Sequence, residues 1–136
     1  MKVAFHQVGV STRGRTDLID ITDDVEGFVE GSGVKDGICL ISSLHSTTAI
    51  AVNEHESGLM KDLLHYIDKE FPMKGEWLHN RVDDNAAAHL ASTFLGAAKG
   101  FPVQKGKLVR GTWQNIFLVE LDGPRSRTVI IEVIGE

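Results

Sequence analysis

The alternation of apolar and polar residues predicts several β-strands in the first half of the chain. At the start, Val3, Phe5 and, less regularly, Val8 and Val10 stand among polar neighbours, as in a strand. β-Branched and aliphatic residues dominate three later segments, and polar or turn-forming residues separate these segments. We therefore predict strands over residues 3–12, 16–21, 37–42 and 47–53.

Apolar residues recur at helical spacing in three other segments. Thr22 is followed by two aspartates, and acidic charge is favourable at a helix start. Asp84 or Asn85 is a typical N-cap, whereas Pro72 and Gly96 are typical of positions just after a helix. We therefore predict helices over residues 22–31, 57–71 and 86–95.

The last third of the chain again has strand character, interrupted by short runs of Gly, Pro, Asn and Asp. The order of predicted strands and helices lacks the strict alternation of a parallel α/β sheet. The predicted fold class is therefore α+β, mainly antiparallel and sandwich-like, in a single domain spanning residues 1–136. The strands predicted in this part cover residues 101–104, 107–113, 116–121 and 127–134.

Length and composition support a single core. The chain has 136 residues, 42% of them hydrophobic, and a chain of this size buries most of its apolar surface in one unit. It has no apolar run long enough to cross a bilayer and no signal-peptide pattern, so we expect a soluble, cytoplasmic protein. The single Cys39 stands in an apolar run and is expected in the core.

Charge and motifs disfavour several function classes. The net charge of −5, with histidine counted as neutral, disfavours binding to nucleic acids or acidic membranes, because both need a basic surface. No phosphate-binding glycine loop, dinucleotide fingerprint, nucleophile elbow or Cys-x-x-Cys pair is present. An anionic ligand would therefore have to be held by a local group of residues.

Three histidines are candidate metal ligands. His45 lies between two predicted strands, His79 in an irregular stretch and His89 near the start of the third predicted helix. Neutral imidazole binds zinc and other first-row metals, and three such ligands with an open position form a catalytic centre. The spacing matches no metal motif, so ordinary surface or core histidines remain the alternative.

Polar residues also gather just before the third predicted helix. Asp84 and Asn85 precede its first turn, where free N–H groups and the positive dipole end suit a phosphate or carboxylate. Asp83 and Asp84 could instead hold magnesium, or the group could simply cap the helix. Asn85 and His89 are four residues apart and share a helix face, so both can reach one ligand.

Residues 111–125 mix strand residues with polar groups. Thr112 and Gln114 would project to the same side of a strand. Glu120 interrupts an apolar strand and is either solvent-facing, an inward general base, or a partner for Arg125 or a histidine. Arg125 either grips a phosphate with two hydrogen bonds or is a surface residue.

Four motifs, which together extend over most of the chain, resemble those of the YjbQ-like family, described as secondary thiamine-phosphate synthases. They are HSTTAIAVNE at residues 45–54, WLH at 77–79, DNAAAHL at 84–90, and GTWQ through DGPR at 111–125. The resemblance implies a jelly-roll-like β-sandwich with two to three helices, assembled as a homotrimer, with a divalent metal, zinc or magnesium, in its site. It implies metal ligation by His45, His79 and His89, substrate or anion binding by Asn53, Glu54, Thr112, Gln114 and Arg125, and catalytic positions at Asp84, Asn85 and Glu120.

The activity that the resemblance implies joins a pyrimidine pyrophosphate to a thiazole phosphate and releases pyrophosphate. Such a reaction requires stabilisation of the leaving anion and exclusion of water. The residues leave two other functions open. One is a non-catalytic trimeric module that binds a small phosphorylated metabolite, and the other is a metal-dependent hydrolase.

Overall fold

The computed structural model describes residues 1–136 as an α+β domain, as the residue pattern predicts. The α-helices are α1 (Thr22–Gly31), α2 (Ser57–Glu70) and α3 (Ala86–Leu95), and a short 3-10 helix η1 covers Leu78–Arg81. No helix is both long and apolar enough to cross a membrane. The strands are β1 (Lys2–Ser11), β2 (Asp17–Asp20), β3 (Gly37–Ser43), β4 (Thr48–Asn53), β5 (Ala98–Gln104), β6 (Lys107–Leu108), β7 (Asn115–Glu120) and β8 (Ser126–Gly135).

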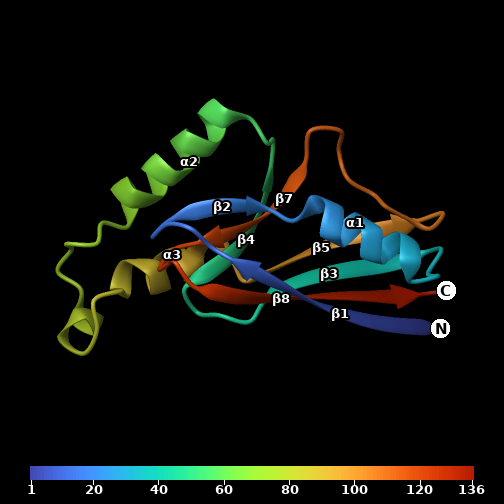
Figure 1. Cartoon of the computed structure of the whole chain (residues 1–136), viewed down its shortest axis with the longest axis horizontal. Coiled ribbons are helices and arrows are strands. Elements are labelled where there is room, and N and C mark those ends of the chain that lie inside the picture. The colour runs from blue at the N-terminus through green and yellow to red at the C-terminus, as the bar shows by residue number, and fades with distance from the viewer.

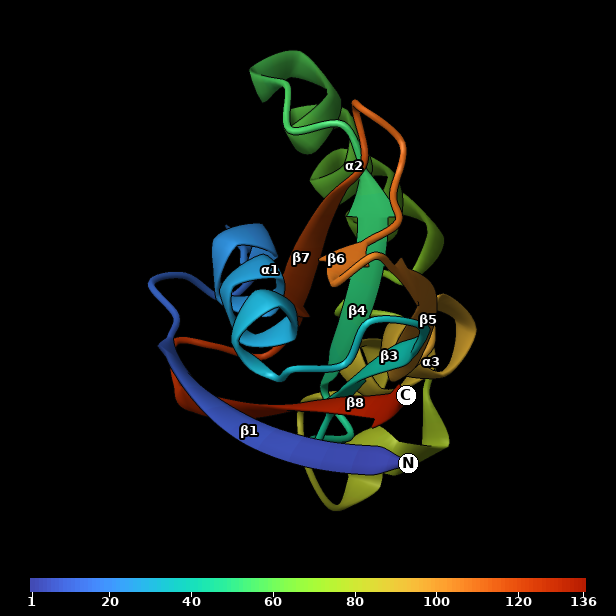
Figure 2. The same cartoon turned by 90° about the vertical axis from the view of Figure 1, so that its right-hand side faces the viewer.

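The strands form two antiparallel sheets that face each other (Figure 1). One sheet has five strands in the order β1-β8-β3-β5-β6, and the other has three in the order β2-β7-β4. Helix α1 lies beside β7, over the part of the large sheet formed by β1 and β8 (Figure 2). The antiparallel, sandwich-like class predicted from the residue pattern is therefore confirmed.

The main core lies between the two sheets and α1. In β8, Val129, Ile131 and Val133 are fully buried, while the residues between them are only partly buried. Helix α1 adds Val25 and Val29 to the same cluster. Each such side chain contributes about 1.5–3 kcal/mol when it leaves water, so the two-residue period of β8 determines which of its faces turns inward.

A second core lies on the other face of the three-stranded sheet, under α2 and α3. Phe117 and Val119 of β7 pack there with Ile67 of α2 and with Ala88 and Ala91 of α3. The small alanines allow α3 to approach the sheet closely. Because both faces of this sheet are covered, β7 is buried almost along its whole length, which explains its unbroken apolar run.

The strand predicted over residues 107–113 is wrong in most of its length. Strand β6 stops at Leu108, and residues 109–114 form a loop. The polar groups of this loop bond to one another instead of to a neighbouring strand. The Gln114 side chain accepts a hydrogen bond from the Gly111 N–H at 2.6 Å, and Arg110 donates to the Gln114 carbonyl. These local bonds replace a strand ladder.

The ends of α3 follow the sequence in part. Gly96 ends the helix with a positive φ of 95°, a conformation that glycine adopts without strain. Asn85 occupies the N-cap position, as predicted, but its side chain makes no capping hydrogen bond. The Asn80 side chain instead accepts from the Ala86 N–H at 3.1 Å. Because Asn80 accepts this bond, the Asn85 side chain is free for other contacts.

The outer face of the five-stranded sheet carries exposed apolar side chains. Val3 and Phe5 of β1, Ile38 and Leu40 of β3, and Ile134 of β8 are each more than a third exposed. The register places Val3 opposite Ile134, and Ile134 opposite Ile38, so the three side chains share this face. In Figure 1 no helix lies on the side of β1 and β8 that faces away from α1. We call it the outer sheet face.

Candidate functional site

The residues predicted to form one site lie in two groups at opposite ends of strands β4 and β7. Thr48 pairs with Glu120 at one end, which we call the pocket end, and Asn53 pairs with Asn115 at the other, the far end. Five residue steps separate these pairs, or about 17 Å at ~3.4 Å per residue. At or near the pocket end lie His45, His79, Asp84, Asn85, His89, Glu120 and Arg125, and at or near the far end lie Asn53, Glu54, Thr112 and Gln114.

The pocket end contains a hollow of about 300 Å³, which we call the cationic pocket. The loop between β3 and β4, the start of α3, and the segment that leads into β8 form its walls. Two arginines line it and no carboxylate does, so the charged side chains of its lining are positive. The lining residues are Leu44, His45, Ser46, Thr47, Asn85, His89, Arg125 and Arg127.

Arg127 is the least exposed charged residue of this pocket, with a side chain only 3% exposed. Its Nε donates to Glu120 Oε2 at 2.8 Å, and its Nη2 donates to Glu120 Oε1 and to Thr47 Oγ1. Nη1 makes none of these hydrogen bonds. Every fully buried side-chain nitrogen and oxygen in the protein has a hydrogen-bond partner, so Nη1 is not fully buried. Nη1 is therefore the nitrogen that Arg127 presents to solvent at the pocket.

Glu120 holds this arginine in place. Its carboxylate also accepts hydrogen bonds from the Thr12 hydroxyl and from the N–H groups of Leu121 and Asp122. Burial by itself raises the pKa of Glu120, but the bonds from Arg127, Asp122 and Thr12 outweigh it and lower the pKa. With an ionised, fully buried and fully bonded carboxylate, Glu120 positions Arg127 and does not offer a base to a ligand.

Arg125 stands at the rim of the cationic pocket on a tight turn. Its Nε donates to the Asp122 carbonyl at 2.9 Å and its Nη2 to the Asp122 carboxylate at 3.0 Å. A side chain at Gly123 would collide with Glu120, since an added Cβ would lie 2.7 Å from Glu120 Cγ. Glycine is therefore required for this close approach, and the turn aims the remaining face of Arg125 outward.

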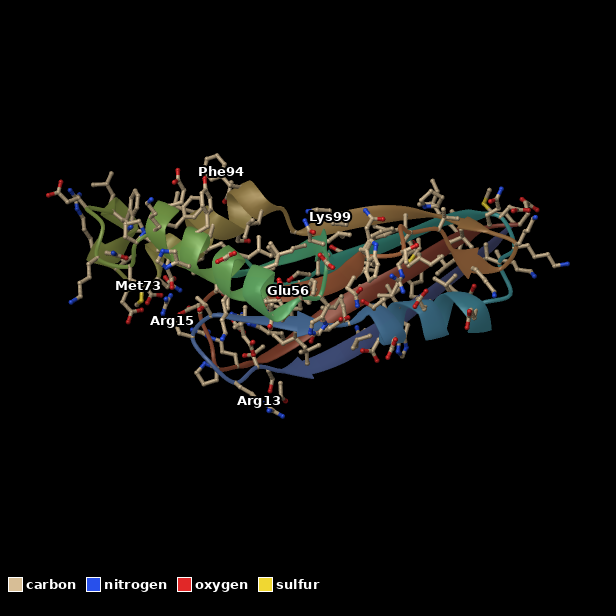
Figure 3. The ribbon with its side chains drawn as sticks, turned by 90° about the horizontal axis from the view of Figure 1, so that it is seen from above. Arg13, Arg15, Glu56, Met73, Phe94 and Lys99 are labelled. Atoms are coloured by element: carbon tan, nitrogen blue, oxygen red, sulfur yellow. The ribbon has the colours of Figure 1, made fainter.

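Asn85 links the rim to the histidines. Its Nδ2 donates to Asp122 Oδ2 at 2.9 Å, and its Oδ1 lies 3.2 Å from His79 Nε2. Asn85 and His89 both line the cationic pocket, which confirms that they share a helix face. Asp84 does not line this pocket but lies at a neighbouring small hollow with Arg15 and Asn85. Figure 3 shows Arg15 near Met73 at this end of the molecule.

His79 and His89 also border an apolar hollow of about 460 Å³. Their ring centroids are 4.7 Å apart in an edge-to-face arrangement. His89 lines both this hollow and the cationic pocket, so the two cavities adjoin at its ring. We call this the apolar hollow, and its lining residues are Trp77, Leu78, His79, Ala86, His89 and Leu90.

His45 lies on the wall of the cationic pocket formed by the β3–β4 loop. The Thr128 N–H donates to its Nε2 at 2.8 Å. Partial burial lowers the pKa of His45, and the positive charges of Arg127 and Arg125 lower it further against the opposing effect of Glu120. Among His, Cys, Asp and Glu, no group of three or more is placed to hold a metal ion. The three predicted histidine ligands thus do not form a three-nitrogen site in this arrangement.

The far end contains a different polar group, centred on Asp20. Its Oδ2 accepts from His55 Nδ1 at 2.6 Å and from Asn115 Nδ2 at 2.8 Å, and its Oδ1 accepts from the Thr22 N–H at 2.9 Å. Figure 3 places Glu56, which caps α2, at the end of that helix away from Arg15. These bonds join β2, α1, the start of α2 and β7, which is a structural task.

Sequence reasoning missed Arg127, Asp20 and His55. Arg127 is the second residue of β8 and follows an exposed Ser126, so nothing in its local pattern distinguishes it from a surface arginine. A useful signal was the alternation in β8, which places Arg127 on the same face as Val129 and Ile131. A charged residue on an inward face needs a charged partner. Glu120, the one charged residue of β7, is that partner.

Comparison with known proteins supports the fold. A crystal structure of a YbjQ-like protein of unknown function from Sulfolobus solfataricus superposes with a TM-score of 0.98, with 59% sequence identity and 99% of both chains covered. A hypothetical protein from Aeropyrum pernix superposes with a TM-score of 0.95 at 41% identity, covering 98% of this chain and 99% of that one.

Sequence relatives agree. A UPF0047 protein of Archaeoglobus fulgidus is 44% identical over 128 residues, which cover 94% of this chain and 99% of that protein. A UPF0047 protein of Methanothermobacter thermautotrophicus is 41% identical over 136 residues, covering all of this chain and 95% of that protein. The family model described as "UPF0047 protein YjbQ-like" matches residues 6–136. The chain therefore belongs to the UPF0047 family of YjbQ-like proteins.

Proposed function

We propose that the cationic pocket binds the phosphate or pyrophosphate group of a small metabolite, and that the protein is a thiamine-phosphate-synthase-like transferase. The observation that carries this proposal is Arg127, a nearly fully buried arginine with one nitrogen left for the pocket. A buried charge is costly unless it is paired. Glu120 offsets that cost, and Nη1 then offers a preorganised donor to an anion.

The apolar hollow suits the rest of such a substrate. It adjoins the cationic pocket at His89, and Trp77, Leu78 and Leu90 supply apolar walls. A flat ring placed there would leave its phosphate end within the cationic pocket. A pyrimidine pyrophosphate has this division into a ring and an anionic end, which supports the reaction that the family resemblance implies.

In the proposed reaction, the thiazole nitrogen forms a bond to the methylene carbon of the pyrimidine pyrophosphate, and the carbon–oxygen bond to pyrophosphate breaks. Negative charge grows on the leaving oxygen. Arg127 Nη1 and the free face of Arg125 stabilise that charge, because fixed donors need no reorganisation during the reaction. Asn85 orients Arg125 through Asp122.

A divalent cation has no assigned step in this proposal. In the present arrangement His45 Nε2 and His79 Nε2 both have hydrogen-bond partners. Zinc or magnesium would supply a Lewis acid to the leaving anion when bound, and the assay below therefore includes both ions as added components.

We also propose that the working unit is a homotrimer. The outer sheet face supports this, since Val3, Phe5, Ile38, Leu40 and Ile134 are exposed there, with Glu132 between Phe5 and Leu40. Contiguous apolar surface on a small domain is typical of association sites. Copies of one chain that meet through such a surface close into rings when the rotation between neighbours allows it.

The test is a direct assay. The protein is incubated with the pyrimidine pyrophosphate and the thiazole phosphate, with and without zinc or magnesium, and thiamine phosphate is measured. We expect product from the parent protein, and loss of most of it in an Arg125→Ala variant. Arg13→Ala is the matched control, because Arg13 is exposed and does not line the cationic pocket. Absence of product from the parent protein contradicts the proposed activity.

One observation favours a second function, a non-catalytic module that binds a phosphorylated metabolite. No carboxylate lines the pocket, and the carboxylate of Glu120, which holds Arg127, is fully occupied by hydrogen bonds. A pocket of this kind serves binding as well as catalysis. In a thermal-shift screen of phosphate esters, a ligand that raises Tm without being consumed identifies the module, whereas release of phosphate from it identifies a hydrolase.

A further inference from the structure

His45 has its ring orientation and its proton placement determined by the main chain. The backbone N–H of Thr128 donates to the ring Nε2 of His45 at 2.8 Å. The backbone N–H of His45 donates to Ser43 Oγ at 3.3 Å. The ring lies in the wall of the cationic pocket, and its Nδ1 makes no hydrogen bond within the chain. One nitrogen is thus committed to the fold and the other is available to a ligand.

We infer that His45 acts as a neutral imidazole that donates a hydrogen bond from Nδ1–H to the bound anion, and not as a metal ligand. This inference rests on the proposed anion-binding role of the cationic pocket. It goes further by assigning the tautomer, the donor atom and the charge state of a residue that the family resemblance implies to be a metal ligand.

The tautomer follows from the chemistry of the peptide group. A peptide N–H only donates, so the Nε2 that it contacts must present a lone pair. A neutral imidazole has one ring proton, which is then on Nδ1. An imidazolium would place Nε2–H against the Thr128 N–H, two donors facing each other. Arg125 and Arg127 line the same pocket and also disfavour a third positive charge.

The same hydrogen bond opposes metal ligation by His45. A metal at Nε2 would have to displace the Thr128 N–H, which belongs to the strand β8. A metal at Nδ1 would move the ring proton to Nε2 and again set it against that N–H. His79 differs, because its Nε2 donates to Asn85 Oδ1, whose amide is itself oriented by Asp122. Its lone pair is then on Nδ1, so the inference concerns His45 alone.

An uncharged donor beside two arginines has a functional consequence. A hydrogen bond to an ionised acceptor is worth more than one between neutral groups, so Nδ1–H contributes to anion affinity without needing a proton from solution. Arg125 and Arg127 supply the charge, and His45 supplies direction at one oxygen of the anion. A tetrahedral phosphoryl group has enough acceptor oxygens for all three donors.

The first test observes the tautomer in the parent protein, so it needs no variant. Nitrogen-15 NMR of the histidine rings, recorded in a chelating buffer, should show His45 Nδ1 protonated and Nε2 unprotonated. Addition of inorganic pyrophosphate should shift the Nδ1 resonance and leave this tautomer unchanged. A protonated Nε2, or a shift of either nitrogen to a metal-bound position with stoichiometric zinc, overturns the inference.

The second test measures binding of inorganic pyrophosphate by calorimetry. We expect the same affinity in chelator and in zinc, and about tenfold weaker binding by His45→Ala, the loss of one hydrogen bond to an ion. His45→Asn, whose side-chain N–H can approach the Nδ1 position, should recover part of it, and Arg13→Ala should bind as the parent does. Binding that requires zinc, or an unchanged affinity in folded His45→Ala, contradicts the role.

These readouts separate the inference from the proposed activity. If no thiamine phosphate forms while pyrophosphate binds and the tautomer is as described, the transferase proposal fails and the role of His45 stands. If product forms but His45→Ala binds pyrophosphate as the parent does, the activity stands and the role of His45 fails.

Discussion

The two ends of strands β4 and β7 use polar residues for different purposes. At the far end, the Asp20 carboxylate accepts hydrogen bonds from Thr22, His55 and Asn115. These bonds join separate elements and leave few free polar atoms for a ligand. At the pocket end, Glu120 does similar work for Arg127, yet one nitrogen of the arginine remains free. A polar cluster becomes a candidate site when its internal bonding is incomplete on the side that faces a cavity.

The difference between the ends also concerns charge. The lining of the cationic pocket contains two arginines and two histidines and no carboxylate. At the far end, the Asp20 carboxylate contacts the ring of His55 and the amide of Asn115. Nearby, Arg110 and Glu26 form an ion pair with a distance of 3.1 Å between Nη2 and Oε1. Anions should therefore distinguish the two ends, and substitutions should affect binding only at the pocket end.

The largest expected effect breaks the buried pair at the pocket end. Arg127→Met leaves the Glu120 carboxylate buried without its counter-ion, which costs about 3–5 kcal/mol in the free energy of unfolding. Urea denaturation followed by circular dichroism measures it. The double variant Glu120→Leu with Arg127→Met removes both charges and should recover most of the loss. A loss below about 1 kcal/mol in the single variant contradicts the pairing.

The second effect tests whether the far end is structural. Asp20→Ala removes the acceptor for the Thr22 N–H, His55 and Asn115, and we expect a loss of about 1–2 kcal/mol in the free energy of unfolding. Pyrophosphate affinity should stay within the error of calorimetry. If affinity falls together with stability, the two ends are not independent and the comparison above fails.

The third effect reverses that pattern. Arg125→Ala should leave stability within about 1 kcal/mol, because the Arg125–Asp122 pair is exposed. It should weaken pyrophosphate binding about tenfold, the loss of a charge-assisted hydrogen bond. Paired measurements of unfolding and binding, with Arg13→Ala as the control, check both parts. A destabilised protein with normal affinity would place Arg125 among the structural residues.

The smallest expected effect is a loss of stability in acid that depends on Asp20. Burial alone raises the pKa of Asp20, but hydrogen bonds from Thr22, His55 and Asn115 outweigh it, so the folded-state pKa lies below the unfolded value. The unfolded chain therefore takes up protons first, and the free energy of unfolding falls as pH drops below about 5. Denaturation between pH 7 and pH 3 measures the slope, and Asp20→Asn should flatten it. An unchanged slope in that variant contradicts the assignment.

Much of the fold could be predicted from local pattern. The alternation in β8, the apolar stripe of α2 and Gly96 at the end of α3 each reflect a local rule, and each appears in the structure. The strand predicted through residues 107–113 failed because Gln114 and Arg110 bond within their own loop. Such competition between local side-chain bonds and a ladder depends on whether a neighbouring strand is present.

The candidate site was harder to predict, for a reason of distance. Residues 53 and 54 and residues 112 and 114 belong to the same motifs as His45 and Glu120, but antiparallel pairing of β4 with β7 carries them to the far end. Motif membership says that residues occur together along the chain. Only the register says on which end of a sheet each one emerges.

The sequence by itself determined the α+β class and most of the strands and helices, because these depend on local periodicity and on turn-forming and polar residues near element ends. The tertiary structure decided the rest. It paired Glu120 with Arg127, gave the Thr128 N–H to His45 and separated the far end from the pocket. Those outcomes depend on which buried groups meet across the sheets, since a buried charge or N–H is stable only with a partner that the fold brings to it.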